Sequence, residues 1–131
     1  MPGAYGRFHA SVSHDRRFTL AVAGGMPIGV DIEAVSTKIV RAGHLFMNED
    51  ERKIVSCSMQ DLPGAATRIW TAKEAAAKAL NLHLVDAWHD IRLAAMGTSE
   101  SSFLYGPLHL TAVHLESWGR IISLVSMPAE S

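Results

Sequence analysis

The 131-residue chain contains one cysteine, little net charge and no long apolar run. Cys57 cannot form an internal disulfide, and the first residues lack the layout of a secretory signal, so we expect a cytoplasmic protein. No segment reaches the roughly 18 continuous apolar residues that a transmembrane helix needs, so we expect no membrane span. Because the formal net charge is only −1, we also expect no nucleic-acid partner.

Zinc signatures, internal repeats and low-complexity linkers are also missing from the sequence. The histidines form neither an HExxH motif nor a cysteine–histidine set, so we do not predict a zinc site. A chain of this length can bury one sizeable core but is short for two ordinary domains. We therefore predict a single domain over residues 1–131, which could itself be a segment of a longer chain.

The apolar patterning predicts an α+β fold, in which an antiparallel β-sheet packs against two main helices. Residues 18–32 are typical of a strand, a turn and a strand, that is, a hairpin. Helices are predicted over 45–59, capped by Asn48, and over 65–82, with start signals at Asp61 and Pro63. Strands are predicted over 88–96, 107–115 and 120–127, with a loop at 97–102 and a second hairpin formed by the last two strands.

The segment GVDIE, residues 29–33, places two acids at the end of an apolar run. On a strand, Asp31 and Glu33 point to the same face, where their negative charges repel each other. A divalent cation such as Mg²⁺ would remove the conflict, because it binds carboxylate oxygens and completes its shell with water and ligand phosphates. The alternative is that both acids lie in a solvated loop where the strand ends.

The segment WTAKEAAAKAL, residues 70–80, adds charged side chains on a predicted helix. Glu74 and Lys78 are four residues apart and share one helical face, and Lys73 lies beside Glu74. One more carboxylate and two ammonium groups would suit a metal-bound diphosphate. The alternative is an exposed Glu74–Lys78 pair that contributes only a few tenths of a kcal/mol.

A histidine upstream completes the set of candidate residues. His14 follows the alternating segment FHASVS and could donate to a phosphate from a strand end, with Ser13 adding a hydroxyl. The alternative is an ordinary surface histidine.

Together these segments resemble a known family, the 4′-phosphopantetheinyl transferases. Members carry a glycine–hydrophobic–aspartate segment, often continuing to glutamate, and later an aromatic–small–any–Lys–Glu segment followed by another lysine. Here these segments are GVDIE at 29–33 and WTAKEAAAK at 70–78, and SVSHD at 11–15 occupies the place of the SHS-like motif of surfactin-synthetase-type members. The resemblance spans Ser11 to about Leu82, and the chain is similar to the second half of a surfactin-type enzyme.

The resemblance implies an activity and roles for particular residues. It implies that the phosphopantetheine arm of coenzyme A is transferred to a serine of an acyl or peptidyl carrier protein, with release of adenosine 3′,5′-bisphosphate. It implies that Asp31, Glu33 and Glu74 bind Mg²⁺. It also implies that Lys73 and Lys78 contact the coenzyme A diphosphate and that His14 contacts a phosphate. For the proton acceptor, Glu74, a metal-bound water and Lys78 remain open.

Two departures from the family pattern shape the expected partners. SHD replaces SHS, which puts Asp15 near an expected phosphate. The first half of a surfactin-type enzyme, which supplies part of the nucleotide pocket, is absent, so we expect either a homo-oligomer or a complementing domain of a longer chain.

The segment LFMNEDERK, residues 45–53, suggests where an acidic carrier protein would dock. Leu45, Phe46 and Met47 would meet its apolar stripe, and Arg52 and Lys53 its acids. The alternative is that Leu45 and Phe46 anchor the helix in the core.

Two other functions remain open from the sequence. One is a non-catalytic, transferase-like interaction module of a larger synthase. The other is a Mg²⁺-dependent diphosphate hydrolase, which would need no carrier protein.

Overall fold

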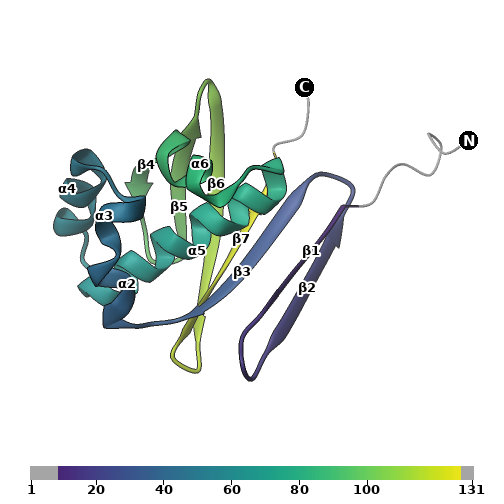
Figure 1. Cartoon of the computed structure of the whole chain (residues 1–131), viewed down its shortest axis with the longest axis horizontal. Coiled ribbons are helices and arrows are strands. Elements are labelled where there is room, and N and C mark those ends of the chain that lie inside the picture. Colours follow the sequence, from purple (N-terminus) through teal and green to yellow (C-terminus); the bar gives the residue numbers. More distant parts are fainter. Residues whose placement is uncertain (1–8, 128–131) are drawn as a thin grey trace, which may run out of the picture.

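The computed structural model describes residues 9–127, which form one long helix, four short helices and two antiparallel sheets (Figure 1). The strands are β1 (His9–His14), β2 (Thr19–Gly24), β3 (Ile28–Ala34), β4 (Ile91–Met96), β5 (Glu100–Tyr105), β6 (Leu108–Ser117) and β7 (Arg120–Ser126). The helices are α2 (Thr37–Arg41), α3 (Gly43–Phe46), α4 (Glu49–Cys57), α5 (Leu62–Leu80) and α6 (Leu84–Asp90).

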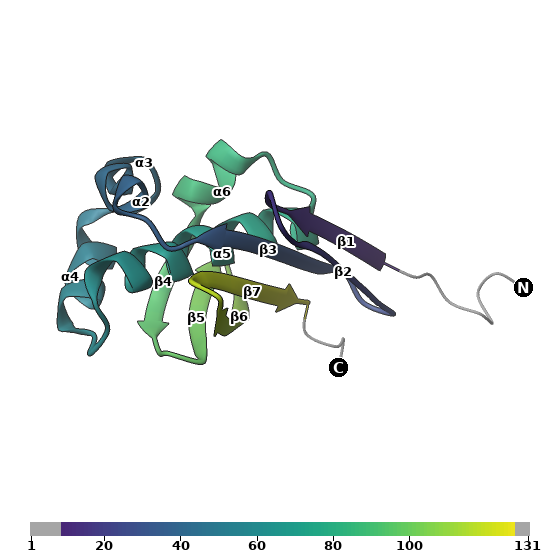
Figure 2. The ribbon, with the colours of Figure 1, turned by 90° about the horizontal axis from the view of Figure 1, so that it is seen from below.

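The main sheet has five antiparallel strands in the order β3-β7-β6-β5-β4. Helix α5 packs across it, chiefly on β3 and β7, and α6 lies on the same side (Figure 2). This arrangement confirms the predicted α+β class. Within residues 9–127, no helix is long and apolar enough to cross a membrane.

The two predicted helix starts are confirmed. The Asp61 side chain accepts a hydrogen bond from the Gly64 N–H (3.1 Å) at the start of α5, and Asn81, with a φ of 56°, ends this helix in the left-handed conformation. Asn48 and Glu51 form a capping box at the start of α4. The predicted helix 45–59 is nevertheless two helices, because Asn48 takes an extended backbone between α3 and α4.

Three elements differ from the sequence prediction. Residues 88–90, predicted as a strand, end helix α6, because Trp88 packs against Trp70 of α5. The predicted loop 97–102 contains the start of β5, because serines occupy positions where apolar residues would have shown a strand. One of them, Ser101, is buried and forms a hydrogen bond with His114. Helix α2 was not predicted.

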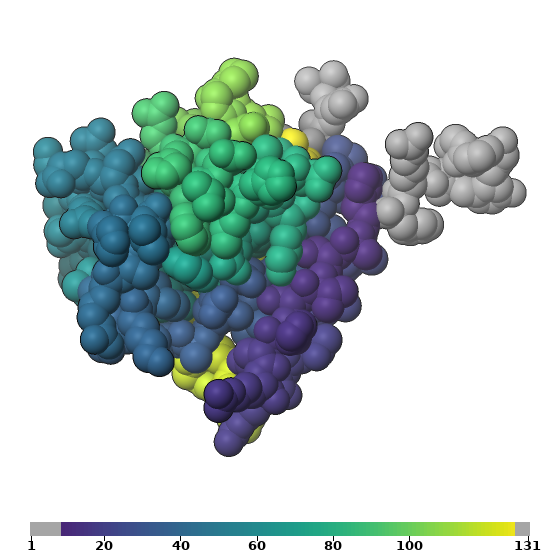
Figure 3. Space-filling model, viewed as in Figure 1, coloured from purple at the N-terminus to yellow at the C-terminus, as the bar shows by residue number. Residues whose placement is uncertain are grey.

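The predicted hairpin over residues 18–32 is wrong in its pairing. Strand β2 pairs with β1, whereas β3 pairs with β7 in the main sheet. The edge of β3 is met by serine hydroxyls of β1: Ser11 accepts from the Val30 N–H and Ser13 from the Ile32 N–H, both at 3.1 Å. The β1–β2 hairpin, purple in Figure 3, therefore covers the β3 edge. The second predicted hairpin, β6–β7, is confirmed.

A buried chain of polar side chains fixes α5 on the sheet. Thr71 of α5 lies 2.6 Å from the Ser123 hydroxyl of β7, and Ser123 is 2.7 Å from Nδ1 of His114 on β6. Burial, with a smaller effect of Arg68, lowers the pKa of His114 to about 4, so its ring is neutral at physiological pH. These bonds set which face of α5 turns toward β3.

Candidate functional site

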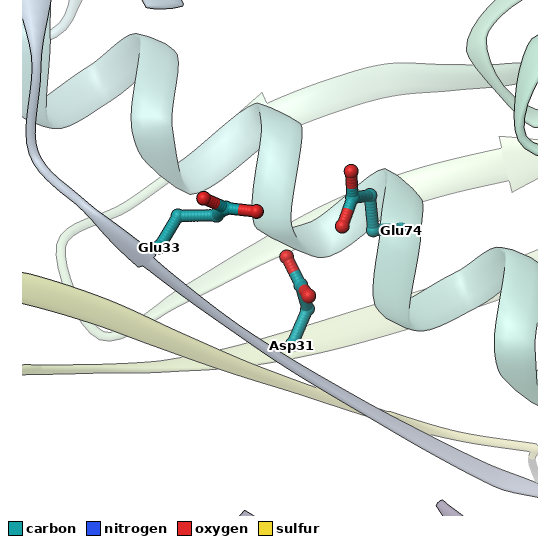
Figure 4. Close-up of side chains that lie close together, drawn as sticks. All are labelled: Asp31, Glu33 and Glu74. Carbon is teal, nitrogen blue, oxygen red and sulfur yellow. The ribbon is translucent and has the colours of Figure 1, made fainter. Parts of the chain in front are cut away.

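Three carboxylates meet in the gap between β3 and α5 (Figure 4). Asp31, Glu33 and Glu74 each offer an oxygen, and these oxygens lie within 4.8 Å of one another. Asp31 is 3% exposed, and the two glutamates are half-buried. The predicted same-face placement of Asp31 and Glu33 is thus present on a buried strand rather than in a solvated loop.

Gly29 allows the strand and the helix to approach this closely. A Cβ added at Gly29 would lie 1.8 Å from the carbonyl oxygen of Ala75 and 2.9 Å from the backbone nitrogen of Ala79. Both atoms belong to the α5 backbone, so any side chain at this position would push the helix away from β3. The glycine of the GVDIE segment therefore sets the distance across which the acids meet.

One stripe of α5 faces the acids of β3. Trp70, Glu74 and Lys78 are spaced by four residues and lie on the same helical face. The Trp70 indole N–H donates to Glu33 (3.4 Å), a Glu74 carboxylate oxygen lies within 4.8 Å of one from each acid of β3, and the Lys78 ammonium lies 3.7 Å from Asp31. Because of this four-residue spacing, each residue of the stripe lies beside an acid of β3.

Burial and mutual repulsion set the charge of the cluster. Burial raises the pKa of Asp31 and also that of Glu33, where the charge of Asp31 adds to the effect. Burial, then the Asp31 charge, raises the pKa of Glu74 to about 9. Without a cation, Glu74 therefore holds a proton at neutral pH.

The donor set fits a hard divalent cation. Asp31 Oδ1 accepts from the Ser13 hydroxyl (3.0 Å), but its buried Oδ2 has no hydrogen-bond partner within residues 9–127. A buried carboxylate oxygen without a partner is costly, and three oxygens that face one another are the ligands Mg²⁺ prefers. The residues that could hold such an ion are Asp31, Glu33 and Glu74.

Lys78 lies at the edge of the cluster. Its ammonium donates to the carbonyl oxygens of Val12 (3.1 Å) and Val30 (2.9 Å) and so ties β1 and β3 to α5. An ammonium has three donors, which leaves one for the cluster or a ligand. A cavity of about 310 Å³ is lined by both Glu74 and Lys78.

The structure does not bring Lys73, the other predicted diphosphate contact, to the acid cluster. Its side chain is fully buried on another face of α5. Its ammonium lies 2.6 Å from the carbonyl oxygen of Phe46, 2.9 Å from that of Trp88 and 2.8 Å from a Glu51 carboxylate oxygen. All three donors are used in the core, so Lys73 has none to offer a diphosphate.

Strand β1 ends at His14, and Asp15 follows it; neither residue belongs to the acid cluster. His14 is exposed and points away from the face that carries Ser13. Asp15 pairs with Arg120 and accepts from the backbone N–H groups of Arg17 and Phe18, and these bonds lower the pKa of Asp15 to about 2. The side chain of Asp15 therefore links the β1–β2 hairpin to β7 rather than facing a ligand.

Sequence reasoning missed two contacts of the cluster. Trp70 lies four residues before Glu74, and this helical spacing was a readable signal for the indole contact. The contact of Ser13 with Asp31 depends on how β1 crosses the β3 edge, which no local pattern encodes.

Comparison with known proteins identifies one family. The family model ACPS, described as the 4′-phosphopantetheinyl transferase superfamily, matches residues 27–122, well over half of the chain. The matched range includes GVDIE and WTAKEAAAK but begins after the β1–β2 hairpin. A search of curated proteins found no match to the chain.

Proposed function

The chain belongs to the 4′-phosphopantetheinyl transferase superfamily, and we propose that, as a single domain over residues 1–131, it transfers the phosphopantetheine arm of coenzyme A to a carrier-protein serine. The observation that carries the proposal is the meeting of Asp31, Glu33 and Glu74 beside the Lys78 ammonium. A diphosphate substrate needs positive charge near its oxygens, and a cation held by the acid cluster would supply it beside the Lys78 ammonium.

The three carboxylates would hold Mg²⁺. The bound ion would supply positive charge to the diphosphate oxygens as a Lewis acid. Lys78 would add its remaining N–H donor, because its ammonium donates to two backbone carbonyl oxygens and already lies beside the cluster. We therefore assign Lys78 to diphosphate binding rather than to proton abstraction.

The transfer step moves one phosphoryl group and one proton. The serine hydroxyl oxygen of the carrier forms a bond to the phosphorus that bears the pantetheine arm. The bond from this phosphorus to the bridging oxygen breaks, and its electrons leave with adenosine 3′,5′-bisphosphate. We propose Glu74 as the acceptor of the serine proton, since it has carboxylate oxygens at the site and is half-buried.

An acyl or peptidyl carrier protein is the proposed partner. A cavity of about 480 Å³ lies among α2, α3 and α4, with Arg41, His44 and Arg52 in its lining beside apolar Met47 and Val55. Basic groups around an apolar floor suit an acidic helix with an apolar stripe. Phe46 is 1% exposed and belongs to the core, so it is not part of this surface.

A second copy of the chain or a complementing domain would complete the nucleotide pocket. Within residues 9–127, Lys78 is the only ammonium or guanidinium in contact with the acid cluster, whereas coenzyme A carries a further phosphate on its ribose. We propose that another copy of the chain or a complementing domain supplies the remaining cations. His14, at the end of β1, stays a proposed phosphate contact.

Mass spectrometry of an apo carrier protein tests this function. The carrier would be incubated with coenzyme A, Mg²⁺ and increasing concentrations of the chain, with and without a chelator. We expect the carrier to gain one phosphopantetheine only when Mg²⁺ is present, and we expect Asp31→Ala and Glu74→Ala to abolish the gain. Glu49→Ala, which removes an exposed acid of α4, serves as the matched control.

The outcomes separate the open possibilities. Activity per chain that rises with chain concentration would favour a homo-oligomer. Release of adenosine 3′,5′-bisphosphate without a carrier protein would favour the hydrolase. No gain on several carriers by a folded chain would favour the non-catalytic module or a missing domain.

A further inference from the structure

The Glu33 carboxylate is held by one side-chain hydrogen bond. Asp31, its neighbour in the cluster, is held by the Ser13 hydroxyl and lies beside the Lys78 ammonium. Within residues 9–127, the Trp70 indole N–H is the single hydrogen-bond donor that reaches the Glu33 carboxylate. Because a glutamate side chain has several rotamers, this one bond decides where its oxygens point.

Trp70 is itself held rigidly by two aromatic neighbours. The Phe46 ring meets it edge-on, with centroids 5.1 Å apart and planes at 86°. The Trp88 ring lies 5.2 Å away at 44°. These contacts fix the plane of the indole and hence the direction of its N–H.

The buried Lys73–Glu51 pair holds those neighbours in turn. The Lys73 ammonium donates to the carbonyl oxygens of both Phe46 and Trp88. Glu51 accepts from Lys73 and from the Leu93 N–H (2.9 Å), which joins β4 to this group. Lys73 thus holds the backbone of the two residues whose rings pack on Trp70.

We propose that Trp70 is a positioning residue of the cation site. Its indole N–H engages Glu33 Oε1, and this bond orients the Glu33 carboxylate toward those of Asp31 and Glu74. The inference rests on the proposed function, because it assumes that the acid cluster binds Mg²⁺. Trp70 would not touch the ion or the substrate, so its effect should appear in cation affinity and in the signal of its own N–H.

Mg²⁺ binding to the full chain tests the proposal. Calorimetry would compare the unaltered protein with Trp70→Phe, which keeps an aromatic ring but loses the donor. We expect the dissociation constant for Mg²⁺ to rise about tenfold, as for other residues that orient metal ligands. Trp118→Phe is the matched control: it removes an indole that is 80% exposed and does not pack on Trp70, and we expect less than about a twofold change.

A second measurement needs no substitution at Trp70. The chain has three tryptophans, and their indole N–H signals in a ¹⁵N-labelled sample can be assigned from Trp88→Phe and Trp118→Phe by elimination. We expect the Trp70 signal to shift as Mg²⁺ binds, with no shift at Trp118, which is 80% exposed. This result would support the proposal even if Trp70→Phe failed to fold.

Two results would overturn the proposal, and they are distinguishable. If the unaltered protein binds Mg²⁺ but Trp70→Phe binds it equally well, or the Trp70 signal does not move, Trp70 does not position Glu33 and the proposed function stands. If the unaltered protein does not bind Mg²⁺ at all, the cation site fails and the inference fails with it.

Discussion

Glu74 sets the pH dependence of cation binding. Since burial and the charge of Asp31 raise the pKa of Glu74 to about 9, Mg²⁺ must displace a proton to use this carboxylate. We predict that the Mg²⁺ association constant rises with pH by up to about tenfold per unit and levels off near pH 9, where Glu74 is already ionised. Calorimetry in two buffers with different ionisation enthalpies would count the released protons.

The matched control for Glu74 is Glu49, an exposed acid in α4. Glu74→Gln should bind Mg²⁺ weakly with little dependence on pH, whereas Glu49→Gln should behave as the unaltered chain does. Mg²⁺ binding without proton release between about pH 6 and 8 would contradict the assignment of a protonated Glu74.

Lys73 has a structural role that its place in the motif does not reveal. Lys73→Met would leave the carboxylate of Glu51 buried without its partner, a change that typically costs about 3–5 kcal/mol. We predict a loss of this size in the free energy of unfolding measured with urea, against at most about 0.5 kcal/mol for Lys53→Met at an exposed position. Near-normal stability together with a large loss of coenzyme A affinity would instead favour the predicted diphosphate contact of Lys73.

At the scale of residues, the sequence predicts the acid cluster but not the surroundings of the lysines. The i, i+2 spacing on a strand places Asp31 beside Glu33, and the i, i+4 spacing on a helix relates Glu74 to Lys78. Lys73 is adjacent to Glu74 in sequence, but neighbouring helical residues point in different directions, about 100° apart. Which of the two side chains enters the core depends on tertiary packing.

The approach of β3 to α5 depends on one glycine. In Gly29→Ala, the new methyl group would overlap the α5 backbone, so strand and helix must separate and the acids of β3 must move away from Glu74. We predict a loss of at least about 1–3 kcal/mol in stability, with weaker Mg²⁺ binding, measured by thermal unfolding and calorimetry.

Gly25→Ala provides the comparison. Gly25 is exposed, and an added Cβ would meet no atom within 4 Å, so we expect a change within about 0.5 kcal/mol. Equal stability of the two variants would show that α5 does not lie this close to β3.

At the scale of elements, local signals predict the long helix well and the pairing of strands poorly. Asp61 and Asn81 bound α5 through capping chemistry, which depends only on nearby residues. The sequence prediction paired β2 with β3 because a turn joins them, but β3 pairs with β7, which lies more than eighty positions later in the chain. Such pairing depends on how the whole sheet buries its apolar face.

The basic cavity among α2, α3 and α4 leads to a prediction for the whole molecule. Arg52 lines this cavity, whereas its neighbour Lys53 is exposed outside it. We predict that Arg52→Glu raises the KM for the carrier protein roughly 5–10-fold, or about 1–1.4 kcal/mol, with little change in kcat. Lys53→Glu makes the same charge change and should have a smaller effect. Equal KM values for both variants and the unaltered chain would place carrier docking elsewhere.

The most direct test is a crystal of the chain grown with Mn²⁺ and coenzyme A, examined for anomalous scattering from the metal. We predict one strong peak bounded by carboxylate oxygens of Asp31, Glu33 and Glu74, with the coenzyme A diphosphate on its open side and the Lys78 ammonium nearby. Coenzyme A bound without a metal peak between these acids, or bound at another place on the molecule, would contradict a cation-assisted transferase site at β3 and α5.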